Sequence, residues 1–167
     1  SVMGPDTINF TFSVSNVPCS GADNGQICLD NLTGGTGPLT PQLVPLPTGS
    51  LDGTCFNVPA GSYQVLVQDS VGCTSDFFDA VVEEPANIEI LPTVTPISCT
   101  GAGDGVLVVD AVGGSGDLEM IAPFVFPTLP DTLFNLGSDS LTLVVADTLG
   151  CIDSITVAIP EPDPVDV

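Results

Sequence analysis

Apolar and polar residues alternate along most of this chain, and the alternation predicts short β-strands. The period is two and the runs are rich in β-branched residues, whereas no segment shows an apolar stripe at helical spacing. Most of the 16 Pro and 18 Gly lie between the runs, where they indicate turns. The predicted strands are 6–15, 25–32, 39–44, 53–58, 62–68, 73–82, 86–95, 105–112, 118–126, 131–136, 140–146 and 151–159.

The same short motifs occur twice in the same order, so the chain contains an internal repeat. Segment 19–25 (CSGADNG) matches 99–105 (CTGAGDG), and segment 67–73 (VQDSVGC) matches 145–151 (VADTLGC). Glycine-rich segments and Glu-Pro pairs follow in the same order. The offset stays between 77 and 80 residues, as expected of equivalent strands joined by loops of slightly different length.

A boundary pattern indicates where the repeats begin. Proline, two further residues and then an apolar–polar–apolar run occur at Pro5, Pro85 and Pro162. The chain would then be part of a longer array, although two domains followed by a short tail would also explain the pattern. The expected domains are the end of a preceding repeat (1–4), repeat 1 (5–84), repeat 2 (85–161) and the start of a following repeat (162–167).

Six or seven short strands in about 80 residues indicate an Ig-like antiparallel β-sandwich for each repeat. The predicted fold class is therefore all-β, with two tandem Ig-like antiparallel β-sandwich repeats arranged end to end. The absence of Trp excludes the core of an antibody-type Ig domain. The expected core residues are Ile27, Phe56, Tyr63, Val65 and Val67 in repeat 1, and Leu107, Phe134, Leu141, Leu143 and Val145 in repeat 2.

Six cysteines predict disulfide bonds and therefore an oxidising compartment. Cys28 and Cys55 have no counterparts in repeat 2, where Val108 and Leu133 are expected to form an apolar contact, and their joint absence indicates one bond. The other four cysteines occupy equivalent positions in the two repeats, Cys19 with Cys99 and Cys73 with Cys151. A metal site built from four thiolates is disfavoured, because no Cys-x-x-Cys pair exists. The expected pairs are Cys28–Cys55, Cys19–Cys73 and Cys99–Cys151.

The chain has no Lys, Arg or His and a formal net charge of −21. Without cations it has no phosphate-contacting patch for nucleic acid, and it is repelled by anionic membranes. Catalysis by a Ser-His-Asp triad or a Lys nucleophile is excluded for the same reason. Two carboxylates could hydrolyse a glycoside, but 8 Phe, 1 Tyr and no Trp are few for an aromatic-lined cleft. We therefore expect no enzyme activity, and no membrane insertion because no run of 18 apolar residues occurs.

Carboxylates without an internal cation make Ca²⁺ the one candidate cofactor, and otherwise none is expected. No EF-hand spacing is present, so a solvated acidic surface is the simpler explanation. The candidate ligands are Asp23, Asn24 and Asp104 in two loops, with Glu83 and Glu84 at the repeat junction.

Five motifs of repeat 1 follow one another in a distinctive order: Cys-x-Gly-x-x-x-Gly at 19–25, GGTGP at 34–38, VPAGSYQV at 58–65, VQDSVGC at 67–73 and EP at 84–85. This set resembles the SprB-type adhesin repeat. Repeat 2 departs from it, with Asp117 in place of the proline, a GSDS segment at 137–140 and Leu141 in place of the tyrosine. The resemblance implies a very long cell-surface protein of gliding Bacteroidetes, and hence an extracellular location and a non-catalytic role in adhesion or filament building.

The tripeptide Asp-(Ser/Thr)-aliphatic occurs more often than the composition alone predicts. It resembles the O-glycosylation signal of exported Bacteroidetes proteins. The alternative is that Asp-Ser and Asp-Thr simply form turns before strands. The hydroxyl groups that the resemblance implicates are those of Thr7, Ser70, Thr132, Ser140, Thr148 and Ser154.

Together these features predict a non-enzymatic structural or adhesive module of a long extracellular bacterial surface protein or filament, in which disulfide-stapled repeats act as a stalk or fibre. The alternative is a glycan- or surface-binding adhesin domain that uses Ca²⁺. Its contact sites would be the apolar segments 77–78 or 124–127, for which core strands are the simpler explanation. The expected partners are neighbouring repeats, further copies associating laterally or end to end, and surface glycans.

Overall fold

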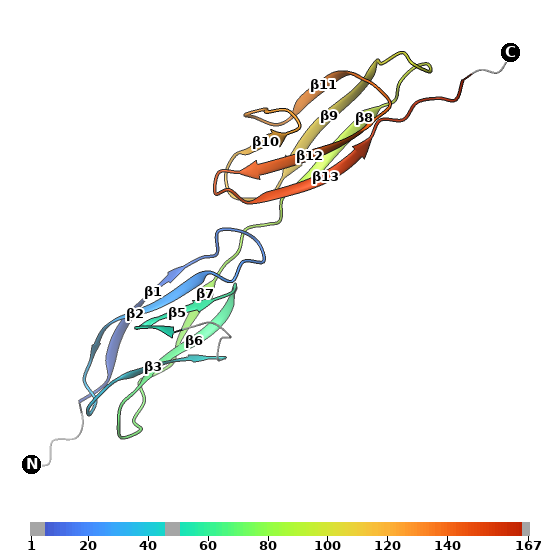
Figure 1. Cartoon of the computed structure of the whole chain (residues 1–167). Coiled ribbons are helices and arrows are strands. Elements are labelled where there is room, and N and C mark those ends of the chain that lie inside the picture. Colours follow the sequence, from blue (N-terminus) through green and yellow to red (C-terminus); the bar gives the residue numbers. More distant parts are fainter. Residues whose placement is uncertain (1–5, 46–50, 165–167) are drawn as a thin grey trace, which may run out of the picture. The chain divides into compact units, whose positions relative to one another are not determined.

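The computed structural model describes residues 6–45 and 51–164, and every regular element in these ranges is a β-strand (Figure 1). The chain divides into two compact units, Ser1–Glu84 and Pro85–Val167. No helix in the described ranges is long and apolar enough to cross a membrane.

Unit 1 is an antiparallel sandwich of two sheets. One sheet has the order β1-β2-β5-β4 and the other β3-β6-β7. This distribution, with the first, second, fourth and fifth strands facing the third, sixth and seventh, is that of a constant-type Ig domain. Its strands are β1 (Asn9–Ser15), β2 (Gly25–Thr33), β3 (Thr40–Val44), β4 (Leu51–Asp52), β5 (Cys55–Val58), β6 (Gly61–Gln68) and β7 (Phe78–Val82).

Unit 2 repeats this topology without a counterpart of β4 in the described part of the chain. Its sheets have the orders β11-β9-β8 and β10-β12-β13. The predicted all-β class with Ig-like antiparallel sandwiches is therefore confirmed, and the sequence repeat is a repeat of structure. The strands are β8 (Glu89–Thr95), β9 (Gly105–Val112), β10 (Leu118–Ala122), β11 (Asp131–Leu136), β12 (Ser140–Asp147) and β13 (Ile152–Ala158).

Several predicted strands are longer than the observed ones, and the largest differences are at 73–82 and 118–126. In place of 73–82, β7 begins at Phe78, because residue Thr74 makes only an isolated bridge to Gln68. In place of 118–126, β10 ends at Ala122 and the chain turns back. Phe126 then exchanges two backbone hydrogen bonds with Met120, at 2.9 and 3.0 Å.

The core of unit 1 lies between its two sheets, as the alternation of apolar residues requires. Ile27, Val65 and Val67 are completely buried, and Phe56 and Tyr63 are nearly so, which confirms all five predictions. The Tyr63 hydroxyl donates to the carbonyl oxygen of Pro59 at 3.0 Å, four residues upstream. This is the tyrosine corner found near the start of the sixth strand of Ig-like domains, and burial raises the pKa of the Tyr63 hydroxyl.

The core of unit 2 corrects one prediction, since Phe134 is 65% exposed and Leu133 is buried instead. Leu133 lies opposite Leu107, but Leu136 lies opposite Gly105, so β11 has one residue more than its partner β9 between these pairs. Asn135 lies in this bulge and has a positive φ of 56°. The other predicted residues hold: Leu107, Leu143 and Val145 are buried, and Leu141 packs against the core.

The predicted Cys28–Cys55 disulfide is confirmed and joins the adjacent strands β2 and β5, with the Cα atoms 4.0 Å apart. The register of unit 2 corrects the expected replacement. Val108 lies opposite Thr132, whereas Leu133 faces the core from the next position. In unit 2, the pair Val108 and Thr132 therefore occupies the place of the Cys28–Cys55 bond.

Candidate functional site

The repeated motifs gather at the two opposite ends of each unit. The leading end of unit 1 comprises residues 6–8, the glycine loop 34–37 and the turn 69–73, and its trailing end comprises the loop 16–24 with Glu83 and Glu84. The equivalent segments of unit 2 are 86–88, 113–116 and 147–151 at the leading end, and 96–104 with 160–162 at the trailing end. The strand β6 separates the two ends, because Gly61 pairs with Val82 beside the trailing end and Gln68 precedes the turn at the leading end.

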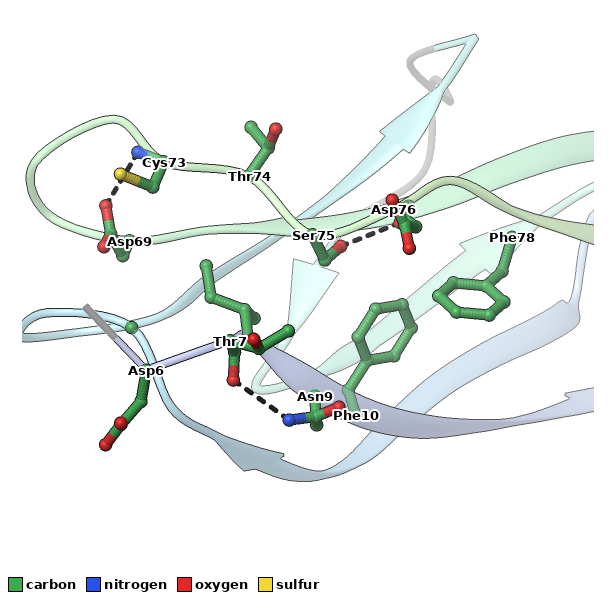
Figure 2. Close-up of a pocket in the computed structure, with 12 residues that line it drawn as sticks. Asp6, Thr7, Asn9, Phe10, Asp69, Cys73, Thr74, Ser75, Asp76 and Phe78 are labelled. Atoms are coloured by element: carbon green, nitrogen blue, oxygen red, sulfur yellow. Dashed lines mark hydrogen bonds between the residues drawn. The ribbon is translucent and has the colours of Figure 1, made fainter. Parts of the chain in front are cut away.

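A buried carboxylate organises the leading end of unit 1. Asp69 is only 5% exposed, and its two oxygens accept the backbone N–H groups of Thr36 at 3.0 Å, Val71 at 3.0 Å and Cys73 at 2.8 Å. Burial by itself would raise the pKa of Asp69, but the backbone donors of Thr36, Cys73, Val71 and Gly72 outweigh it and lower this pKa. The carboxylate thus ties the glycine loop to the cysteine turn, and Figure 2 shows its contact with Cys73.

Unit 2 has the same arrangement around Asp147. Its carboxylate accepts the N–H groups of Ser115 at 2.7 Å, Leu149 at 2.9 Å and Cys151 at 2.9 Å, and these donors lower its pKa against the opposing effect of burial. The glycine motif and the Asp-(Ser/Thr)-aliphatic-Gly-Cys motif, which lie more than 30 residues apart in sequence, are therefore two halves of one structure.

The glycine loops also fix the point where the chain enters each unit. The N–H of Gly35 donates to the carbonyl oxygen of Asp6 at 2.9 Å, and that of Gly114 donates to Ala86 at 2.9 Å. A Cβ at Gly34, whose φ is +83°, would collide with the backbone of Thr7. Only glycine allows this close approach of the loop to the first residues of the unit.

A second carboxylate holds the trailing end. In unit 1, Glu84 accepts the N–H of Gly21 at 2.8 Å and the hydroxyl of Ser20 at 3.4 Å. In unit 2, Glu161 accepts the N–H of Gly101, and donation from the Ser138 hydroxyl and this N–H lowers the pKa of Glu161. The Glu-Pro pair and the Cys-x-Gly loop of each repeat are therefore in direct contact.

The positions of the cysteines overturn two of the three predicted disulfides. Cys19 lies in the trailing-end loop of unit 1, whereas Cys73 lies in its leading-end turn. The eight residues of β6 between these ends span about 25 Å, far more than the Cα separation of a disulfide, about 4.4–6.8 Å. Cys73 and Cys99 are free and exposed, while Cys19 and Cys151 are disulfide-bonded. Cys19–Cys73 and Cys99–Cys151 were therefore the wrong pairs.

The candidate Ca²⁺ ligands lie mostly at the trailing ends and have donors of their own. Asp104 accepts the N–H and hydroxyl of Ser98, at 2.9 and 2.6 Å, and these donors lower its pKa. Glu83 accepts an amide N–H of Asn16 at 3.3 Å, and Glu84 holds the loop that contains Asp23 and Asn24. Within residues 6–45 and 51–164, no group of three or more acidic, Cys or His residues is arranged so that it could hold a metal ion. Ca²⁺ binding stays a prediction.

The candidate glycosylation sites differ in accessibility. The hydroxyls of Ser70 and Thr148 donate to the carbonyl oxygens of Thr36 and Ser115, both at 2.6 Å, so these residues have a structural role in the leading-end turns. Thr132 is half-buried on β11. The residues that present exposed side chains are Thr7, Ser70, Ser140, Thr148 and Ser154, and glycosylation of any of them stays a prediction.

A pocket of about 300 Å³ adjoins the leading end of unit 1, where the segment before β7 leaves the sheet (Figure 2). Phe10 and Phe78 line it with an edge-to-face contact, their ring centroids 5.2 Å apart at 85°, and Cys73 and Asp76 also contribute. The sequence did not identify Phe10 as a pocket residue. The pocket was not expected either, because residues 73–77 were predicted to continue the strand that begins at Phe78. The apolar segments 77–78 and 124–127, for which core strands were the simpler explanation, contain exposed side chains. Phe77 is 59% exposed and Val125 is 72% exposed.

Neither a family model nor a curated protein matches this chain. Among solved structures, it is similar to the C-terminal 282-residue fragment of intimin in complex with the intimin-binding domain of the translocated intimin receptor. The sequence identity is 13% and the TM-score is 0.46. The alignment covers 95% of this chain and 64% of that fragment, so this chain spans less than two thirds of its neighbour.

Proposed function

We propose that this chain is a non-enzymatic structural module of a long extracellular bacterial surface protein or fibre, in which successive Ig-like units form a stalk. The observation that carries the proposal is that the chain enters and leaves each unit at opposite ends, pinned by the same hydrogen bonds. Asp6 and Glu83 mark these two points in unit 1, and Ala86 and Pro160 mark them in unit 2.

Because the chain enters and leaves a unit at opposite ends, each further unit would add its full length to an array. Glu84 is held by the trailing-end loop of unit 1, and Ala86 is held by the glycine loop of unit 2. Pro85 is the one residue between these anchors, and its ring fixes φ. The connection between the two anchored points is therefore short, as the proposed stalk requires.

The chemistry of the chain suits an exposed location. Disulfide bonds form and persist in oxidising compartments, which supports export. The net charge of −21 makes neighbouring surfaces repel one another and opposes collapse of a long array onto itself. In line with the sequence resemblance, we assign the parent protein to SprB-type surface adhesins with a role in gliding or attachment.

Small-angle X-ray scattering of the intact chain tests this function. A stalk module gives an elongated, two-lobed distance distribution that persists at high salt. The matched control carries a flexible Gly/Ser insertion between Glu84 and Pro85, which should broaden the distribution and shorten its mean. A compact distribution for the native chain would contradict the proposal.

A second candidate function is glycan binding at the pocket of unit 1. Exposed aromatic faces and acidic or amide groups are the side chains that bind sugars, and this pocket combines Phe10 and Phe78 with Asp6, Asn9 and Asp76. A glycan array with and without Ca²⁺ tests it, with Phe78→Ala as the variant and Phe134→Ala as the control outside the pocket. Absence of binding under both conditions would remove this candidate.

A further inference from the structure

The chain just before β7 in unit 1 bulges out of its sheet. Phe78, the first residue of β7, lies opposite Val65. The preceding pair is the isolated bridge of Thr74 with Gln68, so four residue steps on one side face three on the other. In unit 2, by contrast, β13 pairs with β12 without a break along its whole length. An extra residue of this kind bends the chain away from the ladder and redirects its side chains.

The hydroxyl of Ser75 stabilises this bulge. It accepts the N–H of Val67 at 3.0 Å, in the place of a backbone carbonyl, and donates to the carbonyl oxygen of Asp76 at 2.9 Å. The N–H of Ser75 donates to the carbonyl oxygen of Val67 at 2.9 Å. These bonds satisfy the backbone of β6 although the chain has left the sheet. The bulge borders the pocket of about 300 Å³ that Phe10 and Phe78 also line (Figure 2).

The two aromatic residues of the pocket are aliphatic in unit 2. Ile90 has the position of Phe10, because each is the second residue of the first strand of its unit. Ile155 has the position of Phe78, because each is paired with the equivalent residue of the preceding strand. Unit 1 therefore differs from unit 2 at its leading end in both the bulge and the aromatic pair. A unit that served only as a spacer would need neither.

We propose that this pocket binds an amino sugar with a free, protonated amine, whose ring packs on Phe10 and Phe78 and whose ammonium group pairs with the carboxylate of Asp76. The inference rests on the second candidate function, glycan binding at unit 1, and names its ligand class. The bulge before β7 is the feature that gives unit 1 this site, while unit 2 serves as a spacer.

The charge of the pocket selects a cationic ligand. The carboxylates of Asp6, Asp69 and Asp76 line it, and the chain has no Lys, Arg or His to balance them. Burial would raise the pKa of Asp69, but its backbone donors outweigh burial and lower this pKa, so Asp69 stays ionised. Anionic sugars are therefore repelled, whereas an ammonium group is attracted to the carboxylates.

The two rings supply the apolar part of the site. Phe10 and Phe78 meet edge to face with their centroids 5.2 Å apart, and Phe78 is 45% exposed. An aromatic face packs against the apolar face of a sugar ring, and it also attracts an ammonium group. The volume of about 300 Å³ is at the lower end for ligand pockets, so the site takes one sugar ring and not several.

The test measures the binding of two probes to the intact chain by isothermal titration calorimetry. One probe is the trimer of β-1,4-linked glucosamine, at a pH where its amines are protonated, and the other is the same trimer with every amine acetylated. The native chain should bind the free amine about tenfold more tightly, as expected of an exposed cation–π contact combined with an exposed ion pair. This preference should decrease as salt screens the attraction.

Three variants separate the pocket from the overall charge. Phe10→Ile/Phe78→Ile copies the isoleucines of unit 2, keeps the net charge of −21 and should lose binding of the free amine. Deletion of Phe77, an exposed residue of the bulge, gives this segment the unbroken pairing of unit 2 and should also lose binding, although both pocket rings remain. Asp76→Asn should bind the two trimers about equally.

Three results would overturn the inference. Equal affinity of the native chain for the two trimers would show that the amine is not recognised, and it would leave glycan binding itself standing. Equal affinity of the native chain and Phe10→Ile/Phe78→Ile for the free amine would show an adventitious attraction to an acidic protein only. Absence of binding to either trimer would also remove glycan binding at this pocket, while the stalk function, tested by scattering, would be unaffected.

Discussion

The carboxylate of Asp69 accepts the backbone N–H of Cys73 at 2.8 Å, and the equivalent contact joins Asp147 to Cys151 at 2.9 Å. One buried side chain in each unit therefore sets the position of the leading-end cysteine and of the glycine loop. The order of the leading end depends on the ionised form of this carboxylate, because only that form has both oxygens free to accept.

Acid should destabilise both units through Asp69 and Asp147. Their pKa values are lower in the folded chain than in the unfolded chain, so the unfolded state binds protons first as the pH falls. The stability they contribute is fully present above the unfolded pKa of about 3.9 and is lost as the pH falls through the lower folded values. Thermal melts between pH 7 and pH 2 measure this loss.

The matched variant for that experiment is Asp69→Asn with Asp147→Asn. An amide presents one acceptor oxygen in place of two, so the variant should melt at a lower temperature at pH 7. The difference between the native chain and the variant should shrink toward low pH. A difference that stayed constant over this range would show that ionisation of these carboxylates does not contribute.

Removing the Cys28–Cys55 bond should destabilise unit 1 alone. The bond closes a separation of 27 residues, for which loop-closure entropy predicts a loss of about 3 to 4 kcal/mol. Denaturant unfolding of Cys28→Ala/Cys55→Ala should show an earlier transition for unit 1 and an unchanged one for unit 2. The control is Cys28→Val/Cys55→Thr, which copies the Val108 and Thr132 of unit 2 and should recover part of the loss by packing.

Leu133 and Phe134 should respond in opposite ways to truncation. Leu133→Ala removes a side chain that is 7% exposed and should cost about 2 to 5 kcal/mol, whereas Phe134→Ala removes one that is 65% exposed and should change the stability little. Urea unfolding of the two variants measures both values. A larger effect at Phe134 would contradict the bulge in β11.

Two glycines with similar backbone angles provide a test of the leading-end contact. Gly21 and Gly34 have φ values of +72° and +83°, but open space surrounds Gly21, whereas a Cβ on Gly34 meets the backbone of Thr7. Gly21→Ala should cost about 1 kcal/mol from backbone strain alone. Gly34→Ala should cost clearly more, and equal melting temperatures for the two variants would exclude the close approach.

Local patterns accounted for much of this fold. The strand positions followed from alternation with a period of two, which depends on neighbouring residues alone. The repeat comparison identified Cys28 and Cys55 as partners, because both lack a counterpart in the second unit. It could not place Phe134, since the extra residue in β11 is visible only in its pairing with β9.

The sequence by itself determined the all-β class, the twofold repeat and the equivalence of the cysteines, because alternation and motif order are properties of the chain read in one dimension. The tertiary structure decided at which end of each sandwich every cysteine lies. The strands that separate Cys19 from Cys73 reverse direction several times, so proximity depends on strand length and sheet order. Because of this separation, the two disulfides expected within the units do not form. Cys73 and Cys99 are free, and Cys19 and Cys151 are not bonded to them.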